Sequence, residues 1–115
     1  MDPNAYGLSP KRFEGDASLL AEVIDIFSSS SPGLIQEVRD AITRADAGAL
    51  ERSAHTLKGA IGNFSAASAF EAARRLESLG AEGRLEKAAE ARLTLEREVE
   101  RLRRALATLI AGHAA

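Results

Sequence analysis

The chain has 115 residues, with 15 lysines and arginines against 17 aspartates and glutamates and no cysteine. This length suits one domain, the lack of cysteine excludes disulfide bridges and thiolate metal sites, and a net charge of −2 argues against binding to nucleic acid or to an anionic membrane. No apolar run approaches the roughly 20 residues that span a bilayer, and the first residues lack a signal-peptide pattern. We therefore expect a soluble cytoplasmic protein and, with His55 and His113 as its two imidazoles, no metal site.

The composition favours helices over strands, because alanine and arginine are abundant whereas aromatic and β-branched residues are few. The helical patterns are joined by short connections, which makes consecutive helices antiparallel neighbours. We predict an all-α fold, an antiparallel four-helix bundle with a short additional N-terminal helix. Its helical domain covers residues 15–111, between an N-terminal lead-in of residues 1–14 and a flexible tail of residues 112–115.

The N-terminal half of the chain predicts two helices separated by a break. Residues 16–30 carry one apolar stripe at helical spacing. Pro32 follows a run of serines and interrupts the pattern, since proline lacks the N–H that a helix interior uses. A second stripe runs to about residue 45, with Ser31 as the helix cap and Pro32 at the first helical position.

The rest of the chain predicts three further helices. The third runs from about 47 to 63, is capped by Asp46, and carries a stripe made of Leu50, Ala54, Leu57, Ile61 and Phe64. The fourth follows Ser65 and stops at Gly80, a typical residue just beyond a helix end; its stripe consists of Ala69, Phe70, Ala73 and Leu76. The last runs from about 83 to 110, with leucines spaced by threes and fours.

His55 points away from the apolar stripe of the third helix. At about 100° per residue, it lies about 140° from the centre of that stripe, on the side that faces solvent. Gly48, Gly59 and Gly62 lie within about 40° of the same direction. Because a glycine inside a helix costs about 1 kcal/mol relative to alanine, the simplest explanation is that bare backbone lets another protein approach the imidazole. Gly59 and Gly62 are therefore candidate partner-binding residues; the alternative for Gly62 is that it eases helix packing or marks a helix end.

Lys58 lies one helical turn after His55, near enough for its ammonium to reach an anion held on the ring. An imidazole has a pKa of about 6.5, so its free nitrogen is available at cell pH without a dedicated base. A neighbouring cation would offset charge on phosphoryl oxygens during transfer, where positioning and electrostatics carry most of the catalysis. The pair therefore suits a nucleophile that accepts a phosphoryl group.

The stretch from Ala54 to Ala60, Ala-His-Thr-Leu-Lys-Gly-Ala, resembles the signature around the active histidine of histidine-containing phosphotransfer (HPt) domains, the relay modules of multistep two-component signalling. The likeness extends from about Phe13 to Leu109 and includes the Leu-Leu-x-x-Val-x-x-x-Phe run of the first helix. It implies a four-helix bundle whose surface histidine takes a phosphoryl group from the aspartyl phosphate of one receiver domain and passes it to another.

The resemblance also implies roles for individual residues. It makes His55 the phosphoacceptor, Lys58 the cation next to the phosphate, and Gly59 the residue that clears the approach. Glu77 falls where family members often carry a glutamine or glutamate, on the neighbouring helix, that orients the imidazole.

We therefore predict a phosphorelay intermediate whose partners are receiver domains of response regulators or hybrid histidine kinases. It would be a monomer without kinase activity of its own, because the chain shows no glycine-rich nucleotide loop, and the receiver would supply Mg²⁺. The alternative is a non-catalytic helical scaffold or oligomerisation module, which the leucine spacing of the last helix suggests. That stripe lasts only about three to four heptads and breaks at Arg92.

Overall fold

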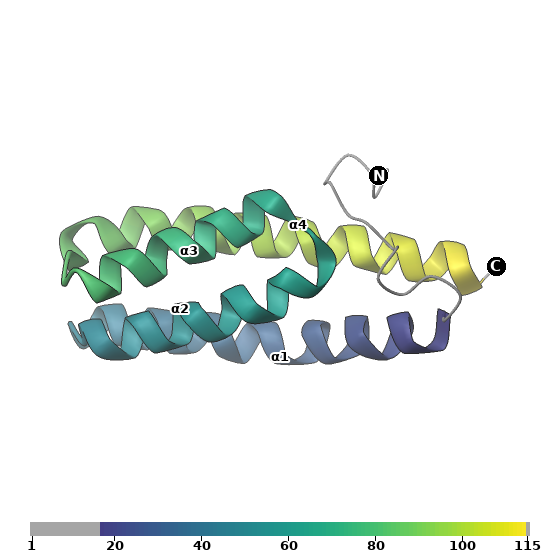
Figure 1. Cartoon of the computed structure of the whole chain (residues 1–115), viewed down its shortest axis with the longest axis horizontal. Helices are drawn as coiled ribbons and strands as arrows, with labels where there is room; N and C mark the ends of the chain where they lie inside the picture. Colours follow the sequence, from purple (N-terminus) through teal and green to yellow (C-terminus); the bar gives the residue numbers. More distant parts are fainter. Residues whose placement is uncertain (1–16, 115) are drawn as a thin grey trace.

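The four helices are α1 (Ala17–Thr43), α2 (Ala47–Ile61), α3 (Ala67–Ala81) and α4 (Ala88–Ala114), in a computed structural model that describes residues 17–114. Two short 3₁₀ turns, η3 (Gly62–Phe64) and η4 (Leu85–Lys87), precede α3 and α4. Each helix packs against the next and α4 packs back on α1, so α2 and α4 lie at opposite corners. Figure 1 shows α1 and α4 extending beyond the α2–α3 hairpin at one end. The predicted all-α four-helix bundle is confirmed.

Helix α1 is continuous, so the break predicted at Pro32 is wrong. Residues 17–30 accordingly form the first half of α1 and not a separate additional helix. The buried side chains keep one helical phase across the proline: they are Leu20, Ile24, Phe27, Ser31, Val38 and Ala41. Ser31, predicted as a helix cap, is thus a core residue. Burial of one uninterrupted face outweighs the roughly 3 kcal/mol that a proline costs in a helix interior.

Arg103 of α4 replaces a hydrogen bond that Pro32 removes from α1. Because proline has no N–H, the carbonyl four residues earlier, that of Ser28, has no helical donor. The guanidinium of Arg103 donates to this carbonyl at 3.3 Å. The contact therefore ties α4 to α1 at the position of the proline.

Helix α2 begins where the sequence predicts. Asp46 has an extended backbone, and its carboxylate accepts a hydrogen bond from the backbone N–H of Ala49 at 3.0 Å, which confirms the predicted cap. The preceding residue, Ala45, is left-handed with a φ of 56° and turns the chain from α1 into α2. The helix ends at Ile61, and η3 occupies the remainder of the predicted range.

Gly80 lies inside α3, so the helix end predicted at this residue is wrong. The left-handed glycine that follows α3 is Gly83, with a φ of 69°. At Gly80 a Cβ would lie 2.6 Å from the backbone nitrogen of Glu51 and 2.9 Å from the carbonyl oxygen of Ala47. The missing side chain therefore lets α3 approach the backbone of α2 closely. The last helix starts at Ala88, later than predicted, because Gly83 and η4 form the turn.

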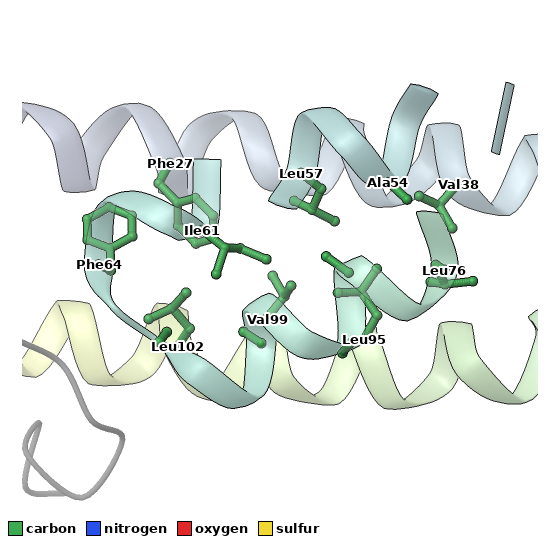
Figure 2. Packing of buried hydrophobic residues seen from close by; sticks show 14 of the residues in the cluster. Phe27, Val38, Ala54, Leu57, Ile61, Phe64, Leu76, Leu95, Val99 and Leu102 are labelled. Carbon is green, nitrogen blue, oxygen red and sulfur yellow. The ribbon is translucent and has the colours of Figure 1, made fainter. Parts of the chain in front are cut away.

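The core is a column of apolar side chains contributed by all four helices (Figure 2). At one end the rings of Phe27 and Phe64 meet edge to face, with centroids 5.3 Å apart. Leu95 and Leu102 of α4 are fully buried in this column. Phe70, predicted as a core residue, instead lies on the surface of α3 with 36% of its area exposed.

None of the helices in residues 17–114 combines the length and apolarity that a membrane crossing requires. Helix α4 continues to Ala114, so residues 112–114, predicted as part of a flexible tail, are helical. The predicted lead-in of residues 1–14 lies outside the described residues.

Candidate functional site

His55 lies in the middle of α2 with 67% of its side chain exposed. Its neighbours Ala54 and Leu57 are buried in the core, which turns the imidazole outward, as the periodicity predicts. The ring Nδ1 lies 2.7 Å from Oε2 of Glu77 on α3. Gly80, one turn after Glu77, permits the close helix contact that brings this carboxylate within reach of α2.

The same carboxylate also holds Lys58. The Nζ atom of Lys58 lies 2.6 Å from Oε1 of Glu77, and 24% of the lysine side chain is exposed. The Lys58 ammonium, and secondarily the His55 ring, hold the pKa of the Glu77 carboxyl below its ordinary value, while partial burial acts in the opposite direction. Glu77 is therefore ionised at neutral pH and joins His55 to Lys58.

The contact with Glu77 determines which nitrogen of His55 is free. An ionised carboxylate only accepts hydrogen bonds, so Nδ1 carries the proton and donates it to Oε2. In the neutral ring the other nitrogen, Nε2, then keeps its lone pair. The arrangement can therefore present Nε2 to an electrophile while the carboxylate stabilises any positive charge that develops on the ring.

The helix face beyond His55 is bare at one glycine and bordered by an aromatic ring at the other. A Cβ placed on Gly59 would meet no atom within 4 Å, whereas a Cβ on Gly62 would lie 3.7 Å from the ring of Phe70. The Phe70 centroid also lies 5.9 Å from Nζ of Lys58. Gly59 thus leaves the backbone open, and Gly62 accommodates an aromatic side chain from α3.

The structure brings His55 and Lys58 into contact with Glu77 and places Gly59 one turn after His55 on α2, whereas Gly62 lies just beyond the end of α2, at the start of η3. The phosphate, partner-binding and orienting roles assigned to these residues stay predictions. Sequence reasoning missed Phe70 as a member of this surface. Its position seven residues before Glu77, hence on the same face of α3, is the signal that could have found it.

Within residues 17–114, no group of three or more histidine, aspartate and glutamate side chains is placed to hold a metal ion.

The fold and the site together define a helical-bundle protein with a solvent-facing histidine whose Nδ1 contacts a carboxylate of the neighbouring helix. Comparison with known families gives a match to the Hpt domain over residues 22–105. The chain therefore belongs to the Hpt domain family, and its role is histidine phosphotransfer in a phosphorelay.

A solved structure with the same fold is histidine-containing phosphotransfer protein B (HptB) from Pseudomonas aeruginosa PAO1. The TM-score is 0.80, the sequences are 22% identical, and the match covers 90% of this chain and 94% of the other. At this identity the likeness shows the shared fold. The comparison with curated proteins gave no match.

Proposed function

We propose that the chain is a phosphorelay intermediate in which His55 accepts a phosphoryl group from the aspartyl phosphate of one receiver domain and donates it to the aspartate of another. The observation that carries this proposal is the exposed ring whose Nδ1 is engaged by Glu77, so that Nε2 faces outward as the nucleophile. The partners would be receiver domains of response regulators or hybrid histidine kinases.

In the proposed step, Nε2 attacks the phosphorus atom of the aspartyl phosphate. A bond forms between nitrogen and phosphorus while the bond from phosphorus to the aspartyl oxygen breaks, and the carboxylate leaves with that electron pair. The imidazole gains positive charge as the bond forms, and the Glu77 carboxylate opposite Nδ1–H stabilises this charge. No proton has to move, so the reverse step can pass the group to a second aspartate by the same path.

Lys58 would supply charge to the phosphoryl oxygens. Its ammonium is held by Glu77 before the group arrives, and three phosphoryl oxygens at Nε2 would compete with Oε1 for it. Mg²⁺, which phosphoryl transfer commonly uses to neutralise charge, would be supplied by the receiver. The protein would have no kinase activity of its own.

Labelling of the protein by a phosphorylated receiver tests the proposal. A receiver loaded from radiolabelled acetyl phosphate should transfer label to the wild-type chain as an acid-labile, base-stable adduct. His55→Gln should abolish the adduct while the circular dichroism spectrum stays helical. His113→Gln, which changes the second of the two histidines, is the matched control and should label normally. Continued labelling of His55→Gln would contradict the assignment.

The same proposal makes the protein a cytoplasmic monomer rather than a scaffold. The leucine spacing that suggested oligomerisation is used inside the bundle, since Leu95, Leu102 and Leu106 are buried in its own core. Sedimentation should give the mass of one chain across a wide concentration range. An oligomer that persists on dilution would favour the scaffold.

A further inference from the structure

Glu51 and Arg52 are two exposed charges of opposite sign on the face of α2 that carries His55. Both lie about one helical turn before the histidine. At about 100° per residue, Glu51 is rotated about 40° from the direction of His55 and Arg52 about 60° in the opposite sense. The two residues therefore lie on either side of the histidine when it is viewed along α2.

Contacts with the neighbouring helices show which charge is on which side. The backbone of Glu51 approaches Gly80 of α3, so Glu51 borders the α3 side. Arg52 lines a hollow of about 380 Å³ together with Glu37 and Asp40 of α1, so Arg52 borders the α1 side.

Neither side chain forms an ion pair within the described part of the chain. Glu51 and Arg52 make no ion pair or side-chain hydrogen bond among residues 17–114, whereas Lys58 and Glu77 neutralise each other. A Cβ on Gly48 would lie 3.3 Å from Nη1 of Arg52 and 3.7 Å from Oδ1 of Asp46, so this glycine lets the guanidinium lie close to the backbone of α2, near the Asp46 carboxylate. The surface beside His55 thus has one carboxylate without an ion pair on the α3 side and one guanidinium without a direct ion pair on the α1 side.

We propose that Glu51 and Arg52 fix the rotational orientation of the receiver docked on His55. An acidic side chain of the receiver would lie over Arg52 and a basic side chain over Glu51. This inference rests on the proposed function, since the docked partner is the receiver. A surface that is negative on one side and positive on the other favours one orientation of the receiver over the reverse. The exposed backbone at Gly59 gives no such preference. Orientation matters because in-line transfer requires that the reacting atoms be aligned.

A charge swap tests the pair without changing the net charge of the protein. The double variant Glu51→Arg with Arg52→Glu keeps both residue types and reverses their positions. Its transfer rate from a subsaturating phosphorylated receiver, loaded from acetyl phosphate, should fall about tenfold, the effect of two weakened charge contacts. Arg52→Lys, which keeps the charge, should retain most of the wild-type rate, and raising the salt concentration should slow the wild type more than the swap.

The matched control is a swap on α4, at the corner of the bundle opposite α2. Glu90 and Arg97 are also exposed charges without a partner in the described chain, and Glu90→Arg with Arg97→Glu should transfer at the wild-type rate. If the α2 swap loses helicity, Glu51→Gln and Arg52→Gln serve instead, each with an expected loss of about threefold.

The outcomes separate this inference from the proposed function. A swapped protein that labels as fast as the wild type overturns the orienting role and leaves His55 as the phosphoacceptor. An equal loss in the α4 swap also overturns it, because the effect would then not belong to the His55 face. A wild-type protein that no receiver labels, or a label that survives His55→Gln, overturns the proposed function and the orienting role together.

Discussion

Replacing Gly59 by alanine should stabilise the fold while it impairs transfer. A Cβ at this position meets no atom within 4 Å, and the residue lies in the last turns of α2. Alanine is favoured over glycine in a helix interior by about 0.5–1 kcal/mol. For a chain of 115 residues, an unfolding entropy of about 2.1 cal/mol/K per residue means that 1 kcal/mol raises Tm by roughly 4 °C, so the variant should melt about 2–4 °C higher.

The same methyl group should weaken contact with the receiver. Gly59 lies one turn after His55, on the face across which the partner must approach. An additional methyl in a well-packed contact costs about 1–3 kcal/mol, which corresponds to about a 5- to 150-fold loss in affinity. Transfer from a subsaturating phosphorylated receiver should slow accordingly, and Gly59→Glu should slow it further, because it adds bulk and a negative charge.

Gly33→Ala is the matched control for this experiment. Gly33 is an exposed helical glycine of α1, and a Cβ there likewise meets no atom within 4 Å. This variant should gain similar stability in urea or thermal unfolding and transfer normally. Normal transfer by Gly59→Ala would refute the idea that the bare face receives the partner. A loss of stability in Gly59→Ala would show that the fold itself needs this glycine.

Three further outcomes follow from the packing. Gly80→Ala should destabilise the protein by about 1–3 kcal/mol in urea unfolding, since its Cβ collides with the α2 backbone; an unchanged midpoint would contradict this. The pKa of Glu77 is lowered in the folded state. Its contribution to stability is therefore present above the ordinary carboxyl pKa of about 4.3 and is lost as pH falls through the folded value. The difference in unfolding free energy between wild type and Glu77→Gln should accordingly shrink as the pH is lowered from about 5 to about 3. Arg103→Met should lower the free energy of unfolding by about 1 kcal/mol, because it leaves the Ser28 carbonyl without a donor. Pro32→Ala restores a backbone donor, so the loss should be smaller in the double variant. Additive effects in a double-mutant cycle would show that Arg103 does not replace the hydrogen bond that Pro32 removes.

Features that depend on a single helix could be predicted from the sequence. The outward direction of His55, the position of Lys58 one turn later and the cap at Asp46 all follow from periodicity or local hydrogen bonding within α2. These features do not depend on how the helices cross, so a single stretch of chain determines them.

Features that depend on packing between helices were predicted less well. A proline after four serines reads locally as a break, yet the buried face of α1 keeps its phase across Pro32 and Arg103 supplies the missing donor. Gly80 reads equally well as a helix end or as a point of close approach, and only the position of α2 decides between them. Phe70 has the spacing of a core residue but lies on the side of α3 next to Lys58 and Gly62.

Glu77 shows how this packing serves a group that has to be passed on as well as accepted. In the proposed relay, its carboxylate stabilises the positive ring of phosphorylated His55 and so favours the loaded state. It also competes with the phosphoryl oxygens for Lys58, which disfavours that state. Glu77 thereby has two opposing effects on the free energy of phosphorylated His55. Because the phosphorylated state is neither strongly favoured nor strongly disfavoured, the phosphoryl group can pass between His55 and an aspartate in both directions.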